Sequence, residues 1–289
     1  MSILELENVS FVYSAGTPFE RTALRNVSIK FEKGKITGLI GHTGSGKSTL
    51  VSLLNGLNRP TCGRILFNGV DIWSVPREIG KLRYKIGLVM QYPEYQLFDE
   101  SVELDIGFGP RNQGLDAREV EERVTQAASF AGLDKDILNK SPFELSGGQK
   151  RRVAIAGILA MEPDVLILDE PAAGLDPRGR REILGGLERL VSERGTTVIL
   201  VSHSMEDMAM YCDNVVVMNK GEIYASGKCY DVFSNTKGLI GVGLDAPLIS
   251  RVAEGLRSRG INIQGEIYTV DGVKKAIKDY LVGGSDHDI

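Results

Sequence analysis

Hydrophobic and polar residues alternate near the start of the chain. In residues 3–13, ILELENVSFVY, this alternation is typical of a half-buried strand. A polar, turn-prone stretch follows, and NVSIKFEKG at 26–34 predicts another strand that ends in a turn. ILFNGVDI at 65–72 has an Asn-Gly pair between apolar runs, which predicts a hairpin.

Four shorter segments are almost wholly apolar. They are KITGLIG at 35–41, KIGLVMQ at 85–91, VLILDEP at 165–171 and TTVILVSH at 196–203. The last two are separated by PRGRREILGGLERLVSERG at 177–195, which has helical periodicity. Apolar strands that alternate with helices predict a mostly parallel sheet of the α/β class.

The middle of the chain, from about 92 to 160, has a mainly helical pattern. Its clearest helix is DAREVEERVTQAASFAG at 116–132, because Asp116 and Glu119 have the spacing of a capping box. We therefore expect a helical insertion between the strand at 85–91 and the strand at 165–171.

The C-terminal part begins with VVVMNKGEIYASG at 215–227, which predicts a hairpin. After about residue 230 the pattern changes, and PLISRVAEGLRSRG at 247–260 and DGVKKAIKDYLVGG at 271–284 predict two short helices in a small appendage. The final residues, SDHDI, are expected to be disordered.

The composition places the chain among globular proteins that do not span a membrane. Its 289 residues suffice for one large domain or two ordinary ones, and no apolar run approaches the roughly 18 residues of a membrane span. The start lacks the pattern of a secretory signal, and the three cysteines form no C-x-x-C pair, which fits a reducing compartment. A net charge of -4 gives no general attraction to nucleic acid, and we expect none as a partner.

A glycine-rich loop, GHTGSGKST, follows the strand at 35–41 and precedes the helical segment STLVSLLNG. It matches G-x-x-x-x-G-K-[ST] in full, and the flanking strand and helix favour a phosphate-binding loop over an ordinary glycine turn. Backbone N–H groups would bind phosphate oxygens, Lys47 would reach the β- and γ-phosphates, and Ser48 would ligate Mg²⁺. The expected nucleotide-binding residues are Gly41, His42, Thr43, Gly44, Ser45, Gly46, Lys47, Ser48 and Thr49; His42 has no expected role beyond its backbone.

Two adjacent carboxylates, Asp169 and Glu170, end the apolar strand at 165–171. Ligands of α/β sheets bind at the carboxyl edge, so Asp169 is placed to hold the water shell of Mg²⁺. The alternation of the strand would point Glu170 elsewhere, where it would polarise an attacking water. Alone, this pair would be interpreted as a solvated strand end; with the glycine loop, we interpret it as catalytic.

A second pair of glycines lies in LSGGQ at 145–149. Together with GHTGSGKST, VLILDEP, AGLD at 173–176 and the VSH of His203, this motif identifies a resemblance to ATP-binding cassette (ABC) ATPases over about residues 3–230. The resemblance implies an α/β P-loop NTPase core with a RecA-like sheet, an antiparallel β subdomain and a helical subdomain at about 92–160. It implies a nucleotide-binding domain at 1–230 and a C-terminal helical appendage at 231–289.

The resemblance also implies roles for single residues. Tyr13 would stack on adenine, although its position on one strand face with Val9 and Phe11 also suits a core aromatic. Gln91 would lie between the Mg²⁺ site and a membrane partner, and both it and Ser48 would be metal ligands. His203 would contact the γ-phosphate, with a structural histidine as the alternative. The resemblance makes Glu170, His203 and Gln91 the catalytic set.

In ABC ATPases two chains face each other head to tail. The resemblance implies that LSGGQ closes over the phosphates held by the other chain's glycine loop, so that each ATP site is composite. It assigns this role to Ser146, Gly147, Gly148 and Gln149, and it places Asp176 of AGLD across the interface.

A finer resemblance begins at Gln91. QYPEYQLFDESVELDIGFGPRNQGL at 91–115 is similar to energy-coupling factor (ECF) ATPases, and GLDPRGRRE and VSHSMEDM resemble the second, A-prime type. This implies a homologous ATPase partner, a transmembrane T subunit, an exchangeable substrate-binding S component and a position on the cytoplasmic face of the membrane. The stretch YPEYQLFDES would dock the T subunit, or else be a plain surface loop; the appendage would join the ATPases. Ala172 departs from the usual Thr without an expected effect.

The resemblance therefore predicts an ATPase subunit that powers uptake of vitamins or other micronutrients. The alternative is an ATPase subunit of a cobalt, nickel or other ABC importer. A soluble ABC protein acting on DNA or ribosomes would have long coiled-coil insertions or two cassettes, and this sequence has neither. A regulatory subunit without hydrolysis is disfavoured because Glu170, Gln91 and His203 are all present.

Overall fold

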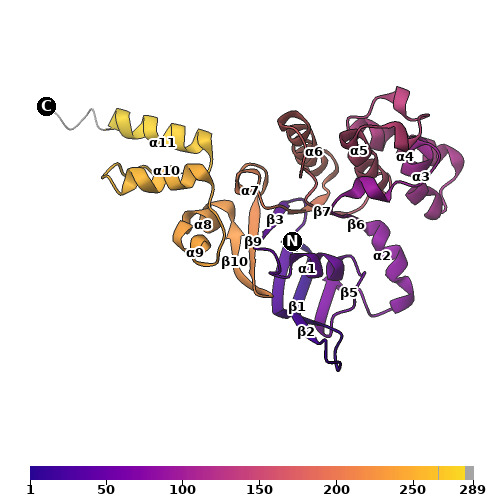
Figure 1. Ribbon diagram of the computed structural model, residues 1–289, viewed down its shortest axis with the longest axis horizontal. Coiled ribbons are helices and arrows are strands. Elements are labelled where there is room, and N and C mark those ends of the chain that lie inside the picture. The colour runs from indigo at the N-terminus through magenta and orange to yellow at the C-terminus, as the bar shows by residue number, and fades with distance from the viewer. Residues whose placement is uncertain (266, 284–289) are drawn as a thin grey trace.

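The computed structural model describes residues 1–265 and 267–283 (Figure 1). The terminal sequence SDHDI, which we expect to be disordered, lies outside the described residues. The described chain contains two sheets, with a group of helices at one end and a pair of helices at the opposite end (Figure 1). This mixture of parallel and antiparallel sheets with helices confirms the predicted α/β fold class.

Four strands form an antiparallel sheet in the order β2-β1-β4-β5. They are β1 (Ser2–Tyr13), β2 (Arg21–Glu32), β4 (Cys62–Phe67) and β5 (Val70–Asp71). Strands β4 and β5 pair through Asn68 and Gly69, which both have positive φ, as a tight hairpin turn requires. The predicted hairpin is confirmed, and β2 begins at Arg21, earlier than the sequence pattern indicates.

Six strands form the central sheet in the order β10-β9-β3-β8-β7-β6. They are β3 (Ile36–Ile40), β6 (Ile86–Val89), β7 (Val165–Asp169), β8 (Thr197–Val201), β9 (Asn214–Asn219) and β10 (Glu222–Lys228). All neighbours pair in parallel except β10, which forms the predicted antiparallel hairpin with β9. The parallel strands therefore end at one edge of the sheet, where α/β proteins bind their ligands.

Three central strands each lead into a helix. These helices are α1 (Lys47–Leu54), α6 (Pro177–Arg194) and α7 (Met205–Tyr211), which follow β3, β7 and β8. On β7, Leu166 and Leu168 belong to the hydrophobic cluster on one face, whereas Val165 and Ile167 belong to the cluster on the other. Because both faces are buried, the strand is a continuous apolar run in the sequence. The sequence pattern did not predict α7.

The segment between β6 and β7 is mainly helical, as predicted. It contains α3 (Val102–Asn112), α4 (Ala117–Phe130), α5 (Gly147–Leu159) and 3-10 turns at Pro93–Gln96, Lys135–Ile137 and Pro142–Glu144. The capping box of α4 is confirmed, because the Asp116 carboxylate accepts from the Glu119 amide at 2.9 Å and the reverse bond is 3.0 Å. A further helix, α2 (Ile79–Lys85), precedes β6 after the 3-10 turn Pro76–Glu78 and was not predicted.

The sequence predicts two short helices in the C-terminal part, whereas the structure has four among the described residues. They are α8 (Cys229–Ser234), α9 (Thr236–Gly241), α10 (Leu248–Arg257) and α11 (Val270–Gly283). Val232, Phe233 and Leu239 pack into the main hydrophobic cluster, whereas Ala253 and Val273 belong to a separate small cluster between α10 and α11. The last two helices lie at the end of the molecule opposite to α3, α4 and α5 (Figure 1).

Candidate active site

The phosphate loop, residues 41–49, connects β3 to α1 across the carboxyl edge of the central sheet. Gly46 caps α1 with a φ of 106°, a left-handed conformation that a side chain rarely adopts. At Gly41 a Cβ would lie 2.5 Å from the carbonyl oxygen of Met218, so only glycine fits against β9. These glycines are therefore required by the fold of the chain itself.

Lys47 is buried at the start of α1. Its Nζ donates to the carbonyl oxygens of Gly41, at 2.6 Å, and His42, at 3.2 Å. Burial lowers the pKa of Lys47, and the nearby charges of Asp169 and Glu170 oppose that shift. The lysine is thus held inside its own loop, in a position from which it can exchange carbonyl partners for phosphate oxygens.

A pocket of about 510 Å³ lies over this loop. It brings together Tyr13 of β1, Gln91, Asp169, Glu170 and His203, which come from distant parts of the sequence. The loop residues that line it are Thr43, Gly44, Gly46, Lys47, Ser48 and Thr49. The other predicted loop residues, Gly41, His42 and Ser45, are not among those that line the pocket.

Glu170 departs from the sequence expectation in its backbone. Strand β7 ends at Asp169, and Glu170 has a φ of 53°, so the alternation of the strand does not set its direction. Its amide donates to the carbonyl of Val201 on β8 at 3.0 Å, which holds this left-handed conformation. Such conformations are costly for residues with a side chain and cluster at functional sites. Seven other described residues with side chains share a positive φ, Glu162 and Lys220 among them, so this backbone sets the direction of Glu170 and does not by itself mark it as catalytic.

The Glu170 carboxylate faces His203. The distance from Oε1 to His203 Nε2 is 3.5 Å, and Oε1 is buried without a hydrogen-bond partner. Burial raises the pKa of Glu170, and the adjacent charge of Asp169 raises it further; burial also raises the pKa of Asp169. Burial, followed by the charge of Lys47, lowers the pKa of His203, so the imidazole is neutral at pH 7 and its contact with Glu170 is no ion pair. A buried acceptor without a donor suits a residue that orients a water.

The groups around Asp169 fit Mg²⁺ only in part. Ser48, Gln91 and Asp169 line the same pocket and offer the oxygen ligands that this ion prefers. Among the described residues, however, no group of three or more His, Cys, Asp or Glu side chains could hold a metal ion. A site with so few carboxylates fits Mg²⁺ that retains waters and phosphate oxygens as its remaining ligands.

Tyr13 is not a core residue, since 41% of its surface is exposed. Its ring packs edge-on against Phe11 with centroids 4.8 Å apart, and its hydroxyl lies 3.2 Å from Thr49 Oγ1 in the phosphate loop. These contacts present the ring to the pocket and leave it free to stack on a ligand.

His42 has more than a backbone role, because its Nε2 lies 3.0 Å from the Asn219 side-chain oxygen and links the loop to β9.

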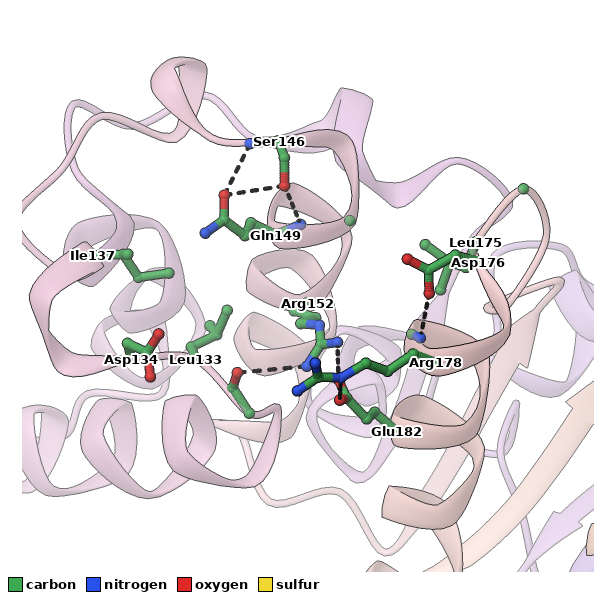
Figure 2. Close-up of a pocket in the computed structure, with 14 residues that line it drawn as sticks. Leu133, Asp134, Ile137, Ser146, Gln149, Arg152, Leu175, Asp176, Arg178 and Glu182 are labelled. Carbon is green, nitrogen blue, oxygen red and sulfur yellow. Dashed lines mark hydrogen bonds and ion pairs between the residues drawn. The ribbon is translucent and has the colours of Figure 1, made fainter.

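The signature segment, residues 145–149, lines a different pocket of about 600 Å³. Ser146 and Gln149 form a capping box at the start of α5, in which the Ser146 hydroxyl accepts from the Gln149 amide at 3.3 Å. Figure 2 shows them on one side of this pocket and Asp176, which caps α6, on the other. The residues Ser146, Gly148, Gln149 and Asp176 line this pocket, whereas Gly147 does not. The structure therefore does not bring the signature segment to the chain's own phosphate loop.

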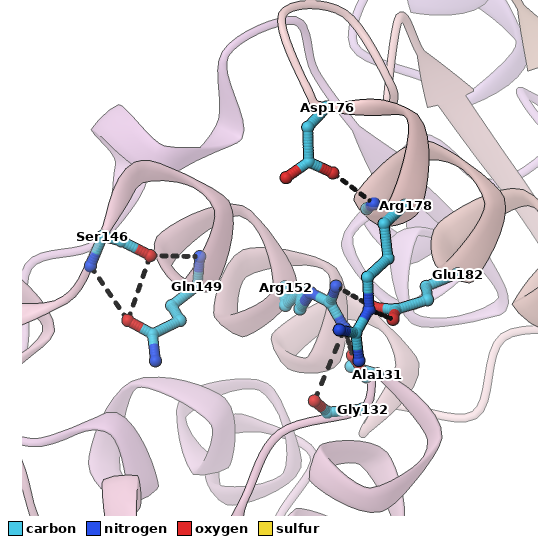
Figure 3. A network of polar contacts seen from close by, with 9 residues as sticks. Ala131, Gly132, Ser146, Gln149, Arg152, Asp176, Arg178 and Glu182 are labelled. Atoms are coloured by element: carbon cyan, nitrogen blue, oxygen red, sulfur yellow. Dashed lines mark hydrogen bonds and ion pairs between the residues drawn. The ribbon is translucent and has the colours of Figure 1, made fainter.

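An ion-pair network crosses the floor of the second pocket (Figure 3). Glu182 of α6 pairs with Arg152 of α5 and, at 2.8 Å, with Arg178 of its own helix. These hydrogen bonds lower the pKa of Glu182 to about 2, first through Arg152 and then through Arg178. Sequence analysis missed this network: the i,i+4 spacing of Arg178 and Glu182 is a local signal, but Arg152 lies 30 residues from Glu182 and leaves none.

Residues 92–101, which contain the stretch predicted either to dock the T subunit or to be a plain surface loop, combine exposed aromatic rings with a buried charge. We refer to them as the docking segment. Phe98 is 60% exposed and packs edge-on against Phe108 of α3, beside a groove of about 310 Å³. Asp105 fixes the backbone here by accepting from the amides of Phe98, at 3.0 Å, and Asp99, at 3.1 Å. Glu94, in contrast, points inward and pairs with the buried Arg151 at 2.8 Å. The carboxylate of Glu94 is therefore not free at the surface.

Comparison with known sequences identifies the family of the chain. The sequence profile of the family described as ABC transporter matches residues 24–173. An energy-coupling factor transporter ATP-binding protein EcfA2 from Clostridium perfringens is 50% identical over 279 residues, which cover 96% of this chain and 98% of the relative. The EcfA2 of Caldanaerobacter subterraneus subsp. tengcongensis is 49% identical over 280 residues, covering 97% and 98%.

Solved structures agree with the sequence relatives. CbiO1 from Clostridium perfringens, described as part of the ABC transporter complex cbiONQ, has a TM-score of 0.75 and 41% identity, covering 88% of this chain and 99% of that chain. The dimeric ATP-binding cassette MJ0796 bound to ADP and Pi has a TM-score of 0.71 and 28% identity, covering 78% and 98%. The chain therefore belongs to the ABC transporter family, as an ATP-binding and ATP-hydrolysing subunit of the energy-coupling factor type.

Proposed function

We propose that this subunit binds ATP with Mg²⁺ and uses hydrolysis to power uptake of a vitamin or other micronutrient through a T subunit and an exchangeable S component. The observation that carries the proposal is the separation of two pockets within one chain. One pocket contains Lys47, Asp169, Glu170 and His203, and the other contains Ser146 of the signature segment. A chain with two separate halves of a nucleotide site suits a transporter motor that closes on a second ATPase.

The hydrolytic step rests on positioning. Tyr13 stacks on the base, and Lys47 leaves the carbonyls of Gly41 and His42 to bind the β- and γ-phosphates. Ser48, Gln91 and Asp169 would hold Mg²⁺, which supplies neutralisation of the phosphate charge when bound. These contacts fix the γ-phosphate in front of the carboxyl edge of the sheet.

Glu170 and His203 act on the attacking side. The Oε1 atom of Glu170 is a buried acceptor without a partner, so it can accept a hydrogen bond from water and orient it in line with the γ-phosphate. The neutral imidazole of His203 keeps one ring N–H, which can donate to a γ-phosphate oxygen. Geometry and electrostatics, rather than covalent chemistry, supply the acceleration.

The partner ATPase completes the nucleotide site. Ser146 and the amides of Gly147 and Gly148 lie at the first turn of α5, where backbone N–H groups and the helix dipole attract anions. We assign these groups, with Gln149 and Asp176, to the nucleotide held by the partner's phosphate loop. The open pocket of about 600 Å³ between α5 and α6 supports this assignment, since Ser146, Gly148, Gln149 and Asp176 all line it.

The membrane partner would dock at the groove beside Phe98. This groove is lined by Leu97, Phe98 and Phe108, so a helix with apolar side chains suits it. None of the helices in the described part of the chain is both long and apolar enough to cross a membrane. As a relative of energy-coupling factor ATPases, this subunit is proposed to lie at the cytoplasmic face of the membrane as a peripheral component, and no nucleic acid enters the proposal.

The C-terminal appendage is proposed to join the two ATPases. We keep the division into a nucleotide-binding domain, 1–230, with its helical subdomain at about 92–160, and an appendage, 231–289. The separate cluster of Ala253, Ile263 and Val273 supports an independently packed unit. Because α8 and α9 pack into the main cluster, the independent part is the pair α10 and α11. Exposed Leu248 and Val252 on α10 suit a contact with the partner.

Reconstitution tests this function. The complex would be purified with its partner ATPase and membrane subunits, placed in liposomes, and assayed for ATP hydrolysis and ATP-dependent uptake of the co-purified substrate. Lys47→Ala should abolish both activities of this site, whereas Lys81→Ala, which removes an exposed lysine paired only with Glu78, should leave both unchanged. If liposomes that contain the wild-type complex hydrolyse ATP but accumulate no substrate, the proposed transport function is contradicted.

A further inference from the structure

Arg151 is the most deeply buried arginine of the described chain, and the hydrolytic mechanism proposed above gives it no role. It lies on α5, two residues after the signature segment, and only 4% of its surface is exposed. Its Nε and Nη2 donate to the two carboxylate oxygens of Glu94, at 3.1 and 2.8 Å, and its Nη1 donates to the carbonyl of Ala173. One guanidinium therefore holds a carboxylate and a backbone carbonyl at the same time.

Arg151 and its two partners, Glu94 and Ala173, belong to three different segments of the chain. Glu94 is in the docking segment, in the 3-10 turn Pro93–Gln96 that begins two residues after Gln91. Ala173 lies in the turn at 171–174, three residues before Asp176, the cap of α6. Arg151 itself is one turn from Ser146, the cap of α5. The guanidinium is thus the meeting point of the docking segment, the signature helix and the turn that carries Asp176.

The chemistry of the contact makes it stiff. Two parallel hydrogen bonds from a planar guanidinium fix both the distance and the orientation of a carboxylate. Burial alone would raise the pKa of Glu94, but hydrogen bonds from Arg151 and from its own backbone outweigh burial and lower it. Because the pair is shielded from water, a displacement of Glu94 requires Arg151 to follow or to lose its partner.

We propose that Arg151 is a positioning residue that transmits movement of the docking segment to the signature segment and to Asp176. The proposal rests on the function proposed above, since it names how the membrane partner is coupled to the composite ATP site. When the docking segment moves with its partner, Glu94 pulls the start of α5 and the Ala173 turn together. Ser146 and Asp176 then approach the partner's nucleotide as one unit.

Two variants break the link without removing the side chains. Arg151→Lys keeps the positive charge but loses the planar fork, and Glu94→Gln keeps a hydrogen-bond acceptor but loses the charge. Arg123→Lys is the control, because Arg123 of α4 pairs with Glu162 in the connection between α5 and β7, and both residues lie outside the docking segment. Each variant would be assayed in the complete reconstituted complex.

The decisive quantity is the number of substrate molecules transported per ATP hydrolysed. We expect Arg151→Lys and Glu94→Gln each to lower this ratio at least about fivefold, while photolabelling of the phosphate loop at Lys47 stays unchanged. The double variant should have the same ratio as either single variant, because both changes break the same link. Arg123→Lys should keep the wild-type ratio.

The outcomes separate the coupling role from a structural role. If transport and hydrolysis fall in proportion, or if only the melting temperature falls, Arg151 merely supports the fold and the inference is wrong. An additive effect of the two substitutions on the ratio would also overturn it. Failure of the proposed function is distinguishable, because it would leave the wild-type complex itself without uptake.

Discussion

The two glycine motifs of this chain meet opposite structural requirements. In the phosphate loop, Gly46 has a left-handed backbone, and an added Cβ would lie 2.8 Å from Leu24 and 3.0 Å from the carbonyl of Ala23. In the signature segment, Gly147 and Gly148 are helical; a Cβ on Gly147 meets nothing within 4 Å, and one on Gly148 only touches Leu175 at 3.8 Å. The chain's own fold needs the first glycines and does not need the second pair.

This difference indicates where each motif acts. The phosphate loop is complete within the chain, because Gly44, Gly46 and the buried Lys47 line one pocket together with Asp169 at the carboxyl edge of the sheet. The signature segment presents a capped helix start to an open pocket in which no described residue requires Gly147 or Gly148 to be small. We propose that these glycines instead leave room for a phosphate from outside the chain, which the start of the helix attracts.

The largest expected effect concerns ATP hydrolysis in the pocket over the phosphate loop. If Glu170 orients the attacking water, Glu170→Gln should lower ATP turnover by about 10²- to 10⁴-fold while ATP binding persists. Turnover and equilibrium binding of a labelled nucleotide would be measured on the same complex. Turnover at the wild-type rate would remove Glu170 from the mechanism. It would also weaken the distinction between the pocket that carries out hydrolysis and the signature segment that completes the partner's site.

The next effect sharpens the comparison of the glycines directly. Gly46→Ala should lower the free energy of unfolding by about 2 kcal/mol or more, since it combines left-handed strain with contact against backbone. Gly147→Ala should change it by less, between zero and a gain of about 1 kcal/mol, because alanine favours the helix. Denaturant titration of the isolated subunit measures both. Equal destabilisation by the two substitutions would break the comparison.

The smallest effect concerns the ion pairs beneath the signature pocket. The pKa of Glu182 is lowered to about 2 from its ordinary 4.5, so the carboxylate stabilises the folded chain at pH values above its unfolded pKa. That stabilisation is lost progressively as the pH falls from 4.5 toward about 2. The gap in melting temperature between the wild type and Glu182→Gln should therefore be constant from about pH 7 to 5 and narrower at about pH 3. A gap that widens on acidification would contradict this assignment.

Sequence patterns predicted the parts of the fold that depend on local periodicity and turns. The apolar strands of the central sheet, the Asn68-Gly69 hairpin and the capping box of α4 were all confirmed. Helix α7 and helix α2 were missed, because each is only seven residues long and provides fewer than two full helical turns of periodicity. Short elements are set by tertiary packing, which no local pattern records.

At the site, motifs predicted which residues meet but not how they are held. Asp169, Glu170, His203 and Lys47 share one pocket, yet the left-handed backbone of Glu170 overrides the strand alternation expected for it. Glu94 was expected at a docking surface, but its side chain points inward and pairs with Arg151. The sequence could not show this, because Arg151 is 57 residues away. Long-range pairings of this kind depend on the fold and have no local signal.

The central claim is that the signature segment serves the partner's nucleotide. The most direct test is a mixed complex in which only this chain carries Gly148→Asp, with each ATP site labelled separately by a photoreactive nucleotide. The Cβ fits within this chain, so folding should be retained, whereas the carboxylate would oppose an approaching phosphate by roughly 4 kcal/mol at about 4 Å and an effective dielectric near 20. We predict lost occlusion at the partner's phosphate loop with labelling retained at Lys47. A defect confined to this chain's own phosphate loop would contradict the account, because the two glycine motifs would then act on the same nucleotide.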